Sequence, residues 1–145
     1  MPGLNPGAEE LTWSLGNHTG YGQWTGSRVS AQEITDLYRG LKESYLDDFD
    51  MMLSGYVPGA EALEAVGRIA QELKEKGKAK PGSFFWVLDP VMGDNGTLYV
   101  AQDVVPMYKS LIPHADLILP NQFEAEYPPP FFFHHTTFCH FLTRI

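Results

Sequence analysis

The chain has 145 residues, a length that supports one hydrophobic core but leaves little for a second domain. Its formal net charge of −8 argues against a surface that neutralises nucleic-acid phosphates or anionic lipid headgroups. The single cysteine, Cys139, excludes an internal disulfide, and no apolar run approaches the roughly 18 residues of a membrane span. We therefore expect a cytoplasmic protein, with the nucleus as a second compartment, that acts on a small molecule and binds neither nucleic acid nor membrane.

The first third of the sequence predicts one clear helix. Residues 1–16, which begin with a stretch rich in proline and glycine, are expected to be a disordered or aberrant end. Residues 17–26 hold three glycines and two aromatics in irregular spacing, which favours a loop or a twisted hairpin. Ser30 and Glu33 have the spacing of a capping box, and apolar residues then recur at helical spacing, so a helix is predicted over about residues 30–43.

Three apolar runs are predicted to be strands of one parallel sheet. The first, 49–56, is expected to be buried. The second, 83–90, holds five consecutive apolar residues, which predicts a central strand covered on both faces. The third is 117–119, and amphipathic helices around 63–73 and 104–111 separate the three runs. Alternating strands and helices are the signature of a parallel sheet with right-handed crossovers, so the predicted fold class is α/β.

Polar residues follow each predicted strand, at the edge where open parallel sheets bind ligands. They are Ser54, Gly55 and Tyr56 after the first, Asp89 and Asp94 after the second, and Asn121 and Glu124 after the third. Carboxylates suit Mg²⁺, and the start of a helix favours anions, so the group would fit a magnesium–nucleotide site. The alternative is that Asp94 only shapes a turn and Asn121 only caps a helix. Spacing alone leaves both interpretations open.

Other polar features of the sequence predict less. His18, in a loop flanked by glycine, could contact a substrate or simply be exposed. Neither the dinucleotide-binding fingerprint nor a phosphate-binding P-loop motif occurs. Residues 127–145 break the α/β pattern at three prolines, so we interpret them as an aberrant or disordered tail. The tail contains four metal-capable side chains without zinc-site spacing, which we interpret as fortuitous: His134, His135, Cys139 and His140.

Four segments occur in the order and spacing of a known family. They are NHTGYGQW (17–24), LSGYVPG (53–59), LDPVMGDNGTLYV (88–100) and LPNQFEAE (119–126). Over residues 17–126 the chain resembles pyridoxal kinase, a vitamin B6 kinase of the ribokinase-like superfamily, and is most similar to the fungal members. The resemblance implies an incomplete ribokinase-like three-layer α/β/α fold with a parallel central sheet. It also implies transfer of the ATP γ-phosphate to the 5′-hydroxyl of pyridoxal, which gives pyridoxal 5′-phosphate.

The resemblance also implies roles for individual residues. Those on the pyridoxal side are His18, Thr19, Tyr56 and Tyr99. Asp89, Asn121 and Glu124 would bind ATP, and Asp94 with Glu124 would bind the metal. The implied cofactors are ATP and Mg²⁺, with a monovalent cation as a further candidate, and the implied partners are B6 vitamers and, for the full-length protein, a second copy in a homodimer. Phosphoryl transfer depends mainly on such positioning and neutralisation of charge.

The sequence also departs from the family pattern. The family has an early strand with a substrate-binding serine and a later GTGD motif that supplies an anion hole and the general base, and this sequence contains neither. Leu119 stands where some relatives have threonine. We therefore assign no catalytic residue. The chain as written is predicted to be inactive, because a general base is worth about 10²- to 10⁴-fold in rate and an oxyanion donor about 10²- to 10³-fold.

Two alternatives to an active kinase remain at this point. The chain could be a non-catalytic truncated isoform or gene-model fragment that binds nucleotide weakly or pairs with a full-length subunit. A magnesium-dependent phosphatase with Asp89 as its nucleophile is disfavoured, because Pro90 and Val91 follow where the DxDx[TV] pattern of that class needs a second aspartate.

Overall fold

The computed structural model of the protein describes residues 15–16, 26–78 and 84–127. The helices of this part are α1 (Ala31–Glu43), α2 (Ala60–Gly77), α3 (Val104–Leu111), the short 3₁₀ helix η2 (Ile112–His114) and α4 (Gln122–Glu126). The strands are β1 (Leu15–Gly16), β2 (Gly26–Ser27), β3 (Met51–Ser54), β4 (Phe85–Leu88), β5 (Gly93–Asp94), β6 (Thr97–Leu98) and β7 (Leu117–Ile118).

The strands β3, β4 and β7 form a parallel sheet in the order β3–β4–β7. Ser54 pairs with Leu88, and Leu88 pairs with Ile118, so the strands end level with one another. This confirms the predicted α/β class and the central place of β4. The strands are shorter than the apolar runs that predicted them, because their flanking residues belong to the loops at each end of the sheet.

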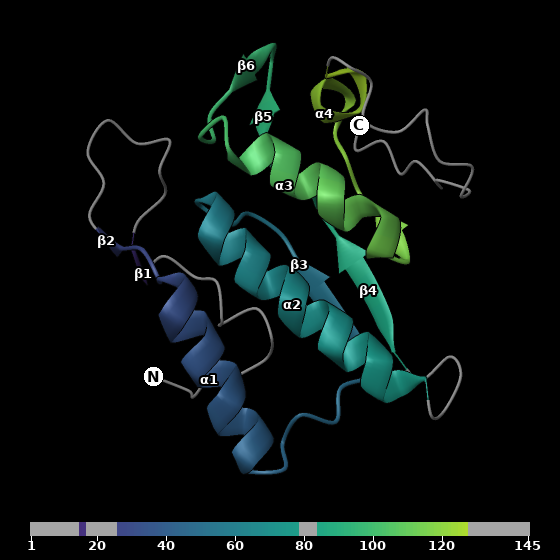
Figure 1. Ribbon diagram of the computed structural model, residues 1–145. Coiled ribbons are helices and arrows are strands. Elements are labelled where there is room, and N and C mark those ends of the chain that lie inside the picture. The colour runs from purple at the N-terminus through teal and green to yellow at the C-terminus, as the bar shows by residue number, and fades with distance from the viewer. Residues whose placement is uncertain (1–14, 17–25, 79–83, 128–145) are drawn as a thin grey trace.

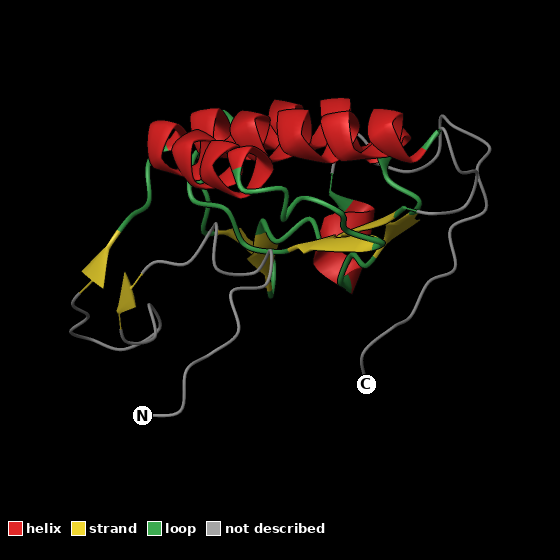
Figure 2. Ribbon diagram, turned by 90° about the horizontal axis from the view of Figure 1, so that it is seen from below, coloured by secondary structure: helices red, strands yellow, loops and turns green. Residues whose placement is uncertain are grey.

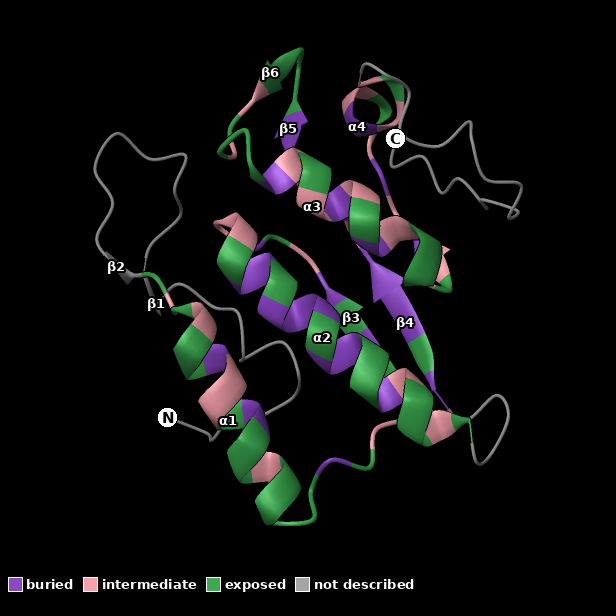
Figure 3. Cartoon of the chain, in the orientation of Figure 1, coloured by how far each residue is buried: buried purple, intermediate pink, exposed green. Residues whose placement is uncertain are grey.

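Helices α1, α2 and α3 lie side by side and form one layer on one face of the sheet (Figures 1 and 2). The core lies between this layer and the sheet, where Leu63 of α2 and Trp86 of β4 are fully buried. The buried positions of α2 and β4 are drawn in purple in Figure 3. Gly67 lets α3 approach α2, since a Cβ atom at this position would overlap the side chain of Leu111.

The other face of the sheet is open over its β3 side in the described part of the chain. Met51, Leu53 and Phe85 are exposed, with exposed fractions of 59%, 43% and 41%. They alternate with the buried Met52 and Trp86, because successive strand residues point to opposite faces. The prediction that 49–56 is buried, and that 83–90 is covered on both faces, was therefore wrong for the exposed residues. The fold is an incomplete three-layer α/β/α arrangement with one helical layer in the described residues.

Local signals at the helix starts are confirmed. Ser30 and Glu33 form the predicted capping box, in which the Ser30 amide donates to the Glu33 carboxylate at 2.7 Å. Near the N-terminus, β1 pairs antiparallel with β2, so these strands flank the segment predicted to be a loop or hairpin. Residues 17–25 of that segment, and residues 128–145 of the tail predicted over 127–145, lie outside the described residues. None of the described helices is long and apolar enough to cross a bilayer.

Candidate functional site at the carboxyl ends of the strands

The carboxyl ends of β3, β4 and β7 begin the loops that carry most of the predicted site residues. The Asp89 amide donates to the Ser54 carbonyl at 2.8 Å, and the Leu119 amide donates to the Leu88 carbonyl at 3.0 Å. These bonds continue the sheet register one residue beyond each strand. They bring the loop that contains Tyr56 next to Asp89. The predicted meeting of polar residues at one sheet edge is therefore a feature of the fold.

Asp94 is part of a hairpin that was not predicted from the sequence. Strands β5 and β6 pair antiparallel, and Asn95 and Gly96 between them have φ values of 49° and 77°. Two central residues with positive φ are typical of the tight hairpin turn that Asn-Gly favours. Asp94 itself is exposed and accepts a 2.7 Å hydrogen bond from the Asn95 amide through Oδ1. The Asn-Gly pair was the sequence signal for this hairpin.

Asn121 caps α4 and also contacts the hairpin. Its Oδ1 accepts from the Glu124 amide at 2.9 Å, and its own amide donates to Glu124 Oε2 at 2.8 Å, which completes a capping box. Its side-chain Nδ2 donates to the Gly93 carbonyl at 2.8 Å. The capping interpretation of Asn121 is therefore correct. The same side chain also ties the start of α4 to β5, two segments that are far apart in the sequence.

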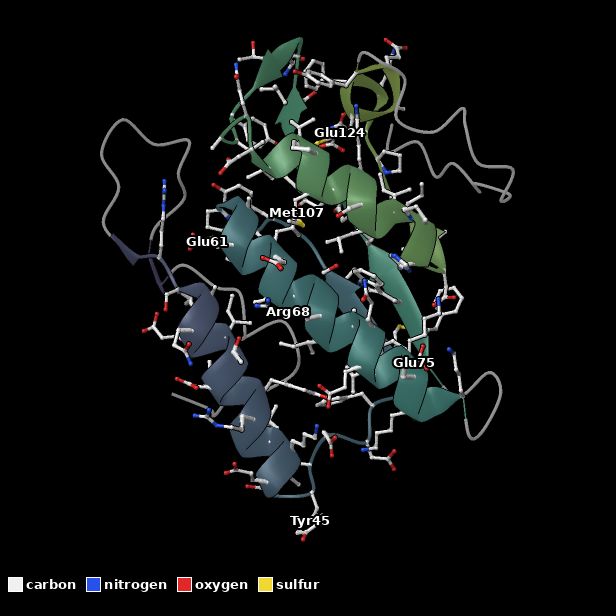
Figure 4. The ribbon with its side chains drawn as sticks, in the orientation of Figure 1. Tyr45, Glu61, Arg68, Glu75, Met107 and Glu124 are labelled. Atoms are coloured by element: carbon white, nitrogen blue, oxygen red, sulfur yellow. The ribbon has the colours of Figure 1, made fainter. Side chains whose placement is uncertain are left out.

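Glu124 is a buried carboxylate, with an exposed fraction of 1%. Its Oε1 accepts from the Met92 amide at 2.9 Å, and the carboxylate also accepts from the amides of Asn121 and Gly93. Figure 4 shows its position beside β5 and α4. Burial raises the pKa of Glu124 above its ordinary value, the charge of Asp89 acts in the same direction, and the three amide bonds oppose both. The carboxylate thus holds the Met92–Gly93 loop against α4.

Gly93 has no room for a side chain at this junction. A Cβ atom there would overlap the ring of Phe123 on α4 and the carbonyl of Thr97 on β6. Contacts this close couple the hairpin to α4, so the position of Asp94 depends on the packing of α4. Glycine at this position is required by close approach, not by its backbone angles.

Tyr99 lies among the other predicted residues. Partial burial raises its pKa, and the charges of Glu124, Asp94 and Asp89 add to the shift, as does Tyr56. Tyr99 is 54% exposed and Tyr56 is 37% exposed, so both rings are accessible at the same edge of the sheet.

Tyr108 of α3 is a polar residue of this region for which the sequence predicted no role in the site. Its side chain is fully buried, and its hydroxyl donates to the Gly55 carbonyl at 3.2 Å. The sequence signal was general: a buried tyrosine hydroxyl usually has a hydrogen-bond partner. The identity of that partner depends on how α3 packs against the loop after β3.

The described residues contain no cluster of three or more histidine, cysteine, aspartate or glutamate side chains that could hold a metal ion by itself. Mg²⁺ at nucleotide sites uses one or two carboxylates, with water and phosphate oxygens completing its coordination. The carboxylates of Asp89 and Asp94 fit that donor set. His18 and Thr19, predicted to contact pyridoxal, lie outside the described residues and stay predictions.

The curated proteins that are similar to this chain are named as pyridoxal kinases. No protein-family model matches the sequence. A Schizosaccharomyces pombe protein provisionally named a pyridoxal kinase is 43% identical over 115 residues, covering 79% of this chain and 36% of its own length. The pyridoxal kinase of Ovis aries is 42% identical over 115 residues, covering 76% of this chain and 36% of its own length. The chain therefore spans little more than a third of the curated relatives it matches.

The solved structures that are similar to this chain are also of pyridoxal kinases. Pyridoxal kinase from Leishmania donovani in complex with ADP and pyridoxamine is 35% identical, with a TM-score of 0.70 over 76% of this chain and 38% of that chain. Plasmodium falciparum PdxK with AMP-PNP and PL is 33% identical, with a TM-score of 0.65 over 77% of this chain and 41% of that chain. Both structures contain a nucleotide.

Proposed function

We propose, from the homology of this chain to the pyridoxal kinases and its incomplete ribokinase-like α/β fold, that the chain carries the pyridoxal-side and phosphate-side residues of a pyridoxal kinase. The reaction of the complete enzyme is transfer of the ATP γ-phosphate to the 5′-hydroxyl of pyridoxal or a related B6 vitamer. The nucleotides in the similar solved structures support an ATP site.

The observation that carries this proposal is that β3, β4 and β7 end level with one another, so the loops that carry Tyr56, Asp89 and Asn121 leave the same edge of the sheet. Burial is the largest cause of the raised pKa of Tyr99, which follows the β5–β6 hairpin, and the negative charges of Glu124, Asp94 and Asp89 raise it further. Three carboxylates beside two accessible tyrosine rings, at the carboxyl edge of a parallel sheet, match the needs of a phosphorylated ligand with an aromatic acceptor.

We assign separate tasks to the three carboxylates. Asp94 is exposed and Asp89 is half-buried, so they would hold Mg²⁺ through oxygen ligands together with water and phosphate oxygens. Mg²⁺, when bound, neutralises phosphate charge. Glu124 fixes the loop that presents Asp94, through its bonds to Met92 and Gly93. A direct metal contact by Glu124 remains a prediction.

The remaining residues would bind the acceptor. Tyr56 and Tyr99 offer ring surfaces for a pyridine ring, and His18 with Thr19 would complete this side. The sequence contains no GTGD segment, so no residue of this chain is assigned the task of taking the proton from the 5′-hydroxyl. We propose that the chain binds ligands at this edge and transfers phosphate by itself slowly or not at all.

Isothermal titration of the purified 145-residue chain with AMP-PNP and with pyridoxal, each with and without Mg²⁺, tests this proposal. We expect nucleotide binding that needs Mg²⁺, pyridoxal binding that does not, and no pyridoxal 5′-phosphate above a no-protein control in the presence of ATP. Absence of binding by both ligands to a chain that melts cooperatively would overturn the proposed function. Formation of pyridoxal 5′-phosphate would overturn only the statement on activity.

A further inference from the structure

The phenol of Tyr108 lies between the two peptide groups on either side of Tyr56. Its hydroxyl donates to the Gly55 carbonyl at 3.2 Å, and the Val57 amide donates to the same phenolic oxygen. One side chain from α3 is therefore bonded to the backbone both before and after a residue of the candidate site. Tyr108 and Val57 are both fully buried, whereas Tyr56 between the tethered positions is 37% exposed.

The segment that Tyr108 holds needs such a tether. The end of β3 is fixed by Ser54, whose hydroxyl accepts from the Trp86 indole at 2.9 Å and whose carbonyl accepts from the Asp89 amide at 2.8 Å. Gly55 follows directly, and apart from its two chain neighbours no atom of the described residues lies within 4 Å of the place where its Cβ would be. A glycine without neighbours has wide backbone freedom, so contacts elsewhere must set the direction of the next residue.

The tether is maintained across the ordinary pH range. Burial raises the pKa of Tyr108, and the charges of Asp89 and Glu124 raise it further, while the bond from Val57 opposes them. The phenol therefore keeps its proton, and the bond to Gly55 needs that proton. Because the phenol stays protonated, the tether does not change over the pH range near neutrality in which histidine side chains titrate.

We propose that Tyr108 is a positioning residue, which sets the orientation of Tyr56 toward the aromatic ligand by fixing the backbone of residues 55–57. Tyr108 is buried beneath the loop and acts through Tyr56, so it is not itself a catalytic residue. The inference rests on the proposed function for its ligand, pyridoxal, but the tether is a property of the ligand-free protein and can be tested separately.

Tyr108→Phe removes the hydroxyl and keeps the ring. The matched control is Tyr38→Phe: Tyr38 is also a buried helix tyrosine, and its hydroxyl has no hydrogen-bond partner among the described residues. Hydrogen exchange of the ligand-free protein should show the Val57 amide exchanging about 3- to 10-fold faster in Tyr108→Phe, the effect expected from losing one neutral hydrogen bond. Tyr38→Phe should leave that amide unchanged.

Ligand titrations then separate positioning from a general structural role. In Tyr108→Phe the Kd for pyridoxal should rise about 3- to 10-fold, while the Kd for AMP-PNP with Mg²⁺ stays within error of the parent. A parallel loss of both affinities would overturn the inference, because it would mean that Tyr108 supports the whole site. Unchanged exchange at Val57 would overturn it as well.

The outcomes also distinguish this inference from the proposed function. If the parent chain binds AMP-PNP but no pyridoxal, the positioning role fails, whereas faster exchange at Val57 would still show the tether. If the parent binds neither ligand, the proposed function fails as well. If Tyr108→Phe does not fold, exchange in the parent decides: the Val57 amide must be protected relative to amides of the exposed Asp94–Gly96 turn. An unprotected Val57 amide overturns the inference.

Discussion

The backbone amide of Met92 donates a 2.9 Å hydrogen bond to Oε1 of Glu124, a residue 32 positions later in the chain. This bond joins the loop after the central strand to the first turn of α4. Asn121 reinforces the junction by donating from its side chain to the Gly93 carbonyl. The residues that look like separate ligands in the sequence thus form one structural unit, with Asp94 at its exposed end.

Glu124→Gln should lower the free energy of unfolding by about 1–3 kcal/mol, because the new amide group faces backbone N–H donors and leaves at least one of them unsatisfied. Urea denaturation measures this. Glu126→Gln is the control: Glu126 lies on the same helix, is exposed, and accepts a hydrogen bond from the Gln122 side chain. A loss as large in Glu126→Gln would show that the effect is not specific to the buried carboxylate.

The stabilisation associated with Glu124 should depend on pH. Burial, the largest cause, holds its folded-state pKa above the ordinary value of 4.5. The folded state therefore binds the proton more tightly than the unfolded state does. This contribution to stability is fully present below about pH 4.5 and is lost as the pH rises through the raised folded-state pKa. The difference in unfolding free energy between the parent and Glu124→Gln should be larger near pH 4.5 than near pH 8, and a difference that grows with pH would contradict this.

Gly93→Ala should destabilise the protein by about 1–3 kcal/mol, because the added methyl group overlaps Phe123 and the Thr97 carbonyl and must push α4 away from the hairpin. Thermal or urea unfolding would show the loss. Gly40→Ala is the matched substitution: Gly40 lies in α1, and a Cβ there meets no atom of the described residues within 4 Å apart from its chain neighbours and the backbone of its own helix. Alanine should therefore stabilise the helix by about 0.5–1 kcal/mol. The two changes should therefore have opposite signs.

Asp94→Asn should weaken AMP-PNP binding at least about tenfold when Mg²⁺ is present, and change it little when Mg²⁺ is absent. The asparagine keeps a side-chain oxygen that can accept from the Asn95 amide, so the turn should persist. Asp103→Asn serves as the control, since Asp103 is exposed and makes no side-chain capping bond at the start of α3. Equal losses in both variants would point to a general effect of negative charge.

Local patterns were sufficient for much of the fold. The capping signals of Ser30 with Glu33 and of Asn121 depend on residues within one helical turn, so both appear in the sequence and in the structure. The apolar run around Trp86 predicted the central strand because it too is a pattern of neighbouring residues. The four family-like segments were enough to indicate the homology, because their order and spacing are specific. The Asn95–Gly96 pair carried a hairpin signal that was interpreted only as a turn.

Packing between distant segments decided the rest. Whether Glu124 meets a metal ion or backbone amides depends on where α4 packs against β5, and no pattern of nearby residues contains that information. The bond from Tyr108 to Gly55 spans 53 positions and requires α3 to lie over the end of β3. Exposure of Met51, Leu53 and Phe85 likewise follows from the placement of α1–α3 on one face of the sheet. Hydrophobic runs specify that strands form, but only the tertiary arrangement determines which of their faces is covered.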